Sequence, residues 1–91
     1  MNSSLVEAYV PKLSEAEHRA AVERARASAR ALSRDGTTIS YRTSLFVPED
    51  ETCFHVFEGS SPEAVAEATR MAELAYARIV PVTVEQAEEK S

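Results

Sequence analysis

The segment covering residues 41–65 constrains the fold most strongly, because it combines strand-forming residues, a turn and a helix start. Residues 38–47 alternate between apolar and mostly polar side chains, which predicts a strand near the edge of a sheet. Residues 48–51 begin with a proline and predict a short hairpin connection. Residues 52–58 are apolar on both faces, so they predict a buried return strand.

The part of the chain that precedes this segment predicts one strand and one long helix. Residues 4–10 favour a strand that Pro11 ends. Ser14 and Glu17 have the spacing of a capping box, in which each side chain accepts a hydrogen bond from the other residue's backbone N–H. The helix that starts there is expected to run to about residue 33.

The part that follows predicts a second helix and a last strand. Ser61 can cap the helix and Pro62 suits its first position, so we expect a helix to about residue 72. Residues 78–84 predict the strand, and Pro81 assigns that strand to an edge of the sheet.

The predicted order is therefore β-α-β-β-α-β, which is typical of an α+β ferredoxin-like fold. It gives a four-stranded antiparallel sheet with the first and third strands central and both helices on one face. We expect a single domain over residues 1–84 and a polar C-terminal tail over residues 85–91. Because helices cover one face only, a second copy is expected to cover the open face, in a homodimer of the dimeric α/β-barrel kind.

Composition excludes several classes of partner. The net charge of −5 argues against nucleic acid, which is bound through lysine and arginine contacts to phosphate. The longest apolar run is far too short to span a membrane. No signal peptide is visible, and a single cysteine allows no internal disulfide, so we expect a cytoplasmic protein.

Candidate site residues follow from strand alternation. If Val6 faces the helices, the open face receives Glu7 and Tyr9 from the first strand and Cys53 and His55 from the third. Arg42 and Ser44 are further candidates for that face. The predicted ligand-binding set is Glu7, Tyr9, Arg42 and His55.

The same residues allow two kinds of chemistry and one simpler interpretation. Glu7 and His55 could act as base and acid. Glu7, Cys53 and His55 could instead coordinate a transition metal such as nickel or zinc. The simpler interpretation is that these groups satisfy one another in a dimer interior, with His18 a partly buried packing residue and Cys53 an inert thiol.

Three segments resemble one bacterial family: LVEAYVP at residues 5–11, SEAE at 14–17 and TCFHVFEGSSPEAV at 52–65. That family comprises small ferredoxin-like proteins of mostly unknown function, and it includes nickel-binding members. The resemblance covers residues 4–84. It implies an acid at Glu7, histidines where this chain has Tyr9 and Val10, and a cysteine where it has His55.

Three functions stay open at the level of the sequence. The first is a non-enzymatic homodimer that binds a small molecule or a metal on the open face. The second is a cofactor-free enzyme of the dimeric-barrel kind, an isomerase or monooxygenase, and the third is a purely structural interaction module.

Overall fold

The computed structural model describes residues 2–12, 14–76 and 78–85, and it confirms the predicted order of elements. The elements are β1 (Asn2–Tyr9), α1 (Glu15–Arg34), β2 (Ile39–Val47), a 3₁₀ turn (Pro48–Asp50), β3 (Thr52–Gly59), α2 (Pro62–Met71) and β4 (Arg78–Val82). Compared with the prediction, β1 starts two residues earlier and β4 ends two residues earlier. The predicted tail lies outside the described residues, apart from Glu85.

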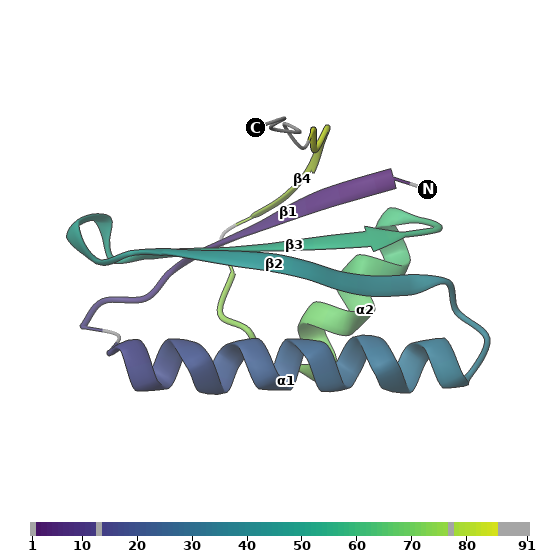
Figure 1. Ribbon diagram of the computed structural model, residues 1–91, viewed down its shortest axis with the longest axis horizontal. Coiled ribbons are helices and arrows are strands. Elements are labelled where there is room, and N and C mark those ends of the chain that lie inside the picture. Colours follow the sequence, from purple (N-terminus) through teal and green to yellow (C-terminus); the bar gives the residue numbers. More distant parts are fainter. Residues whose placement is uncertain (1, 13, 77, 86–91) are drawn as a thin grey trace, which may run out of the picture.

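The strands form one antiparallel sheet in the order β2-β3-β1-β4. The first and third strands are central, as predicted. Both helices lie on one side of the sheet, α1 along its length and α2 behind it (Figure 1). This is the ferredoxin-like α+β arrangement.

Both helices begin at the predicted caps. The Ser14 hydroxyl accepts from the Glu17 N–H at 3.1 Å, and the Glu17 carboxylate accepts from the Ser14 N–H at 3.0 Å. In α2 the Ser61 hydroxyl accepts from the Ala64 N–H at 3.2 Å. Neither of the two described helices is long and apolar enough to cross a membrane.

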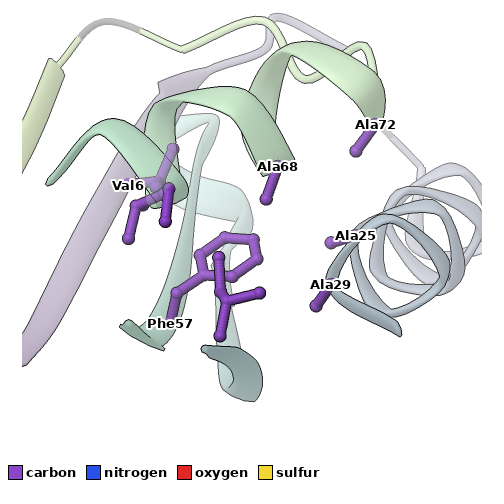
Figure 2. Packing of buried hydrophobic residues seen from close by; sticks show 9 residues of the cluster. Val6, Ala25, Ala29, Phe57, Ala68 and Ala72 are labelled. Atoms are coloured by element: carbon purple, nitrogen blue, oxygen red, sulfur yellow. The ribbon is translucent and has the colours of Figure 1, made fainter. Parts of the chain in front are cut away.

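The core lies between the helices and the sheet and is built around one large ring. Phe57 on β3 is fully buried, and alanines from both helices surround it, among them Ala25, Ala29 and Ala68 (Figure 2). Small side chains at these positions allow the helices to approach the sheet closely. The cluster comprises Val6, Ala25, Ala29, Ile39, Phe57, Ala64, Val65, Ala68 and Ala72.

A β-bulge in β2 changes which of its side chains face the helices. Tyr41 is opposite Phe57 and Thr43 is opposite Val56, so β2 contains one extra residue, Arg42, at this point. The predicted alternation through β2 is therefore wrong beyond the bulge. Ser44 is opposite His55 and lies on the helix side, where it meets α1, and not on the open face.

Candidate functional site

The pairing of β1 with β3 decides where the predicted site residues point. Val6 is directly opposite His55, and Ala8 is directly opposite Cys53. Residues directly opposite in an antiparallel pair project to the same side of the sheet. Because Val6 belongs to the core under the helices, His55 and Cys53 project toward the helices as well. The expectation that they lie on the open face is wrong, since a strand apolar on both faces does not reveal its orientation.

Glu7 lies on the other side of the sheet from this pair. It is opposite Phe54 on the open face, and its carboxylate accepts from Arg78 Nε at 2.6 Å. The structure thus does not bring Glu7 together with Cys53 and His55, either as a metal set or as an acid–base pair. Within the described residues no three His, Cys, Asp or Glu side chains form a group that could hold a metal ion.

Tyr9 and Arg42 also have partners within the chain. The Tyr9 hydroxyl donates to the Glu51 carboxylate at 3.2 Å, and this contact raises the pKa of Tyr9. The Glu51 carboxylate also accepts from the Lys12 N–H at 2.8 Å, which ties the segment after β1 to the β2–β3 hairpin. Arg42 forms an ion pair with Glu58, with 3.8 Å between the charged atoms. Glu7, Tyr9 and Arg42 therefore contribute to structure at the open face.

His55 instead belongs to a mixed polar and aromatic group between α1 and the sheet, which we call the histidine cluster: His18, Tyr41, Ser44, Phe46 and His55. His55 is 1% exposed, and its Nδ1 lies 2.6 Å from the Tyr41 hydroxyl. The His18 ring stacks with two others, with its centroid 5.0 Å from that of Phe46 and 5.7 Å from that of His55. Sequence reasoning treated His18 as packing, although its spacing from Val22 and Ala25 placed it on the buried stripe.

Burial keeps both imidazoles neutral at physiological pH. It lowers the pKa of His55 to about 4, with smaller contributions from His18 and Arg24, and it also lowers the pKa of His18. Burial raises the pKa of Tyr41 to about 12. Since Tyr41 keeps its proton, we assign its hydroxyl as the donor to His55 Nδ1, which leaves the imidazole proton on Nε2.

Cys53 lies in the same layer as the histidine cluster. It is 2% exposed, and burial raises the pKa of its thiol. A protonated, enclosed thiol is a poor nucleophile and a poor metal ligand, because both roles require the thiolate.

The outer end of the histidine cluster opens onto a surface hollow at the first turns of α1. The hollow is lined by Glu15, His18, Arg19, Ser44, Phe46 and Pro48. His18 Nε2 lies 3.3 Å from the Ser44 hydroxyl, while its Nδ1 is buried without a hydrogen-bond partner in the described part of the chain. A buried imidazole nitrogen without a hydrogen-bond partner among the described residues is an uncommon feature of a folded protein.

One family model and one solved structure match the chain. A family model described as "Nickel responsive protein SCO4226-like" matches residues 5–82. The crystal structure of SCO4226 from Streptomyces coelicolor A3(2) superposes with a TM-score of 0.68 at 16% identity, covering 92% of this chain and 99% of that one. At this identity the likeness of the structures shows the fold alone. No curated protein matches the chain significantly.

Proposed function

The chain belongs to the SCO4226-like family of nickel responsive proteins, and we propose that it is a non-enzymatic binding protein for a transition metal, nickel first, that works as a homodimer. The family description supplies the class of ligand. The observation that carries the proposal is the presence of two neutral, buried imidazoles in one cluster, His18 and His55. Neutral imidazole suits nickel, zinc and copper, and it binds them without first losing a proton.

Metal binding has a direct test in the stability of the protein. A ligand that binds only the folded state raises the free energy of unfolding by about 2.7 kcal/mol at a hundredfold excess over its dissociation constant. We expect Ni²⁺ to raise the melting temperature of tag-free protein, and we expect EDTA to reverse the rise. An unchanged melting temperature, together with no nickel retained on equilibrium dialysis, would contradict the proposal.

We place the interface of the homodimer on the open face, which is the side of the sheet that neither helix covers. Its centre is apolar, and the register places these side chains next to one another: Leu5, Leu45, Phe54, Val56 and Val80. Leu45 is 54% exposed although it lies in this apolar row. Ion pairs flank the centre on two sides, Glu7 with Arg78 and Arg42 with Glu58. An apolar centre within a charged rim is typical of a protein interface.

A single charge should separate the two copies. Leu45→Glu would place a carboxylate in the apolar centre of both protomers, so we expect the dimer dissociation constant to rise about tenfold or more. Ala27→Glu is the matched control, because Ala27 is exposed on α1 away from the sheet. Sedimentation equilibrium measures both variants. A wild-type protein that is monomeric at about 50 μM would refute the homodimer.

A small-molecule site on the open face is the second candidate. The observation that favours it is a hollow there, lined by Ser3, Arg42, Thr43, Val56, Glu58 and Val84. In a homodimer this hollow would lie next to the interface. Arg42 is its cationic group and would select an anionic ligand that competes with Glu58. An Arg42→Gln variant that binds metal normally but loses retention of such a ligand would support this function.

A further inference from the structure

We infer that a phosphate monoester of a small, soluble molecule binds between Arg26 of α1 and Arg42 of β2, in a hollow at the β2 edge of the sheet. We call it the arginine hollow, and it is lined by Val22, Arg26, Tyr41, Arg42, Thr43 and Ser44. This inference goes beyond metal binding. It also differs from the second candidate function, because the hollow on the open face is lined by Arg42 but not by Arg26.

The lining of the arginine hollow is mostly polar and has a positive charge. Two guanidinium groups and three hydroxyl groups line it, and the described residues contribute no carboxylate to this lining. The whole chain, in contrast, has a net charge of −5. A concave site with cations and without acids concentrates anions locally, even on an acidic protein.

Both guanidinium groups keep hydrogen-bond donors for a ligand. Arg26 Nη1 lies 3.6 Å from the Glu23 carboxylate, and Arg42 Nε lies 3.8 Å from the Glu58 carboxylate. Both distances are longer than a hydrogen bond, whereas Arg78 donates to its carboxylate at 2.6 Å. The side chains of Arg26 and Arg42 are 54% and 51% exposed. Exposed ion pairs of this kind are weak, so an anion can compete with them.

The two arginines reach the hollow from two different elements. Burial raises the pKa of Tyr41 to about 12, and the positive charge of Arg26 opposes part of that rise. The charge of Arg26 therefore acts at the inner wall of the hollow, where Tyr41 lies. Arg42 is the extra residue of the β-bulge, between the lining residues Tyr41 and Thr43. An ion in the hollow would thus join α1 to the edge strand.

This set of donors favours a phosphate monoester among the common anions. Guanidinium groups bind phosphate oxygens through charge-assisted hydrogen bonds that are often paired. A phosphate monoester has about 1.5 to 2 negative charges at pH 7, so it can use both arginines. A phosphodiester or a carboxylate has a single charge. The Tyr41 and Ser44 hydroxyls contact the two histidines, and that of Thr43 remains as a neutral donor.

The size of the hollow favours a small molecule as the source of the phosphate group. Its volume is about 380 Å³, which lies within the range of small-molecule sites. A phosphate group fills only part of this space, and the rest can receive the organic part of the ligand. The net charge of −5 disfavours nucleic acid and anionic membrane surfaces as the source.

A titration followed by ¹H–¹⁵N NMR tests the binding of the anion. Methyl phosphate is the probe, and dimethyl phosphate, which has one charge, is the comparison at the same ionic strength. We expect methyl phosphate to shift the Nε–H resonances of Arg26 and Arg42 until they saturate, and to bind about tenfold more tightly than dimethyl phosphate. Equal binding of the two probes, or shifts that do not saturate, would overturn the inference.

Single substitutions test the two arginines. We expect Arg26→Gln and Arg42→Gln each to weaken the binding of methyl phosphate about tenfold. Arg34→Gln is the matched control, because it removes the same charge from an exposed position of α1 that does not line the arginine hollow. It should leave the affinity unchanged, and an equal loss in this control would overturn the site. Circular dichroism checks that each variant is folded.

Arg26→Gln also separates this inference from the second candidate function. If Arg42→Gln loses the anion and Arg26→Gln keeps it, the arginine hollow is overturned and a site on the open face is left intact. Sedimentation with neutral vesicles that contain phosphatidylinositol 4-phosphate measures the lipid as an alternative source. We expect the protein to stay in solution, and retention on these vesicles would overturn the small molecule as the ligand.

Discussion

At the scale of single residues, the two histidines have different roles although they stack on each other. His55 is enclosed, hydrogen-bonded to Tyr41 and held neutral by burial. His18 is at the edge of the same cluster; one of its nitrogens contacts Ser44, and the other has no hydrogen-bond partner among the described residues. The position of a ring within the cluster therefore decides how many of its nitrogens find a partner among the described residues.

The pH dependence of stability tests the enclosure of His55. Its folded pKa is about 4, and a histidine in an unfolded chain has a pKa of about 6.5. As pH falls below about 6.5, the imidazole therefore binds a proton in the unfolded state but not in the folded state. The resulting loss of stability approaches about 3 kcal/mol near pH 4, and the full contribution is present above about pH 6.5.

Urea unfolding at a series of pH values measures this loss. Carboxylates also titrate in this range, so the comparison is with His55→Gln, which keeps every carboxylate but has no imidazole at this position. We expect the wild-type protein to lose about 3 kcal/mol more than the variant between pH 7 and pH 4. Equal losses in the two proteins would mean that His55 is not enclosed.

At the scale of the elements, two adjacent serines provide a matched test of how α2 begins. Ser61 caps the helix through the Ala64 N–H, whereas Ser60 is exposed one residue earlier. We expect Ser61→Ala to lower the free energy of unfolding by about 1 kcal/mol, and we expect Ser60→Ala to change it by less than about 0.5 kcal/mol. Chemical denaturation of both variants measures the difference. Equal effects would contradict the assignment of the cap.

The elements themselves were largely predictable, and the site was not. Both caps follow from short-range chemistry at Ser14, Glu17, Ser61 and Pro62, and the order of strands follows from the β-α-β-β-α-β pattern. The orientation of β3 could not be predicted in this way, because its residues are apolar on both sides. Only the pairing of Val6 with His55 fixes which side meets the helices. The contact of His18 with Ser44 joins residues 26 positions apart, a distance at which local patterns give no signal.

At the scale of the whole molecule, the core is thin because most of the core residues on the helix side are alanines. Ala68 is fully buried above Phe57 (Figure 2), and Arg24 of α1 donates to the Ala72 carbonyl at 2.9 Å, which holds α2 against α1. A small domain with so little aliphatic bulk gains much of its packing from close approach of its layers. The spacing between helices and sheet should therefore tolerate little expansion.

Ala68→Leu tests that tightness. The extra side chain would have to enter a filled space, so we expect a loss of about 1–3 kcal/mol in the free energy of unfolding. Ala27→Leu makes the same change at an exposed position of α1 and should alter stability by less than about 0.5 kcal/mol. Thermal or urea unfolding distinguishes them. An Ala68→Leu variant with an unchanged free energy of unfolding would show that the helices and the sheet can separate freely.

The bulge at Arg42 allows β2 to place two hydroxyls on the same side of the sheet. Ser44 comes three positions after Tyr41, so in a regular strand the two side chains would project to opposite faces. The extra residue brings both hydroxyls under α1, one to His55 and the other to His18. A chain that lost Arg42 would need no bulge, because Tyr41 and Ser44 would then be two positions apart in a regular strand and would still share the helix side.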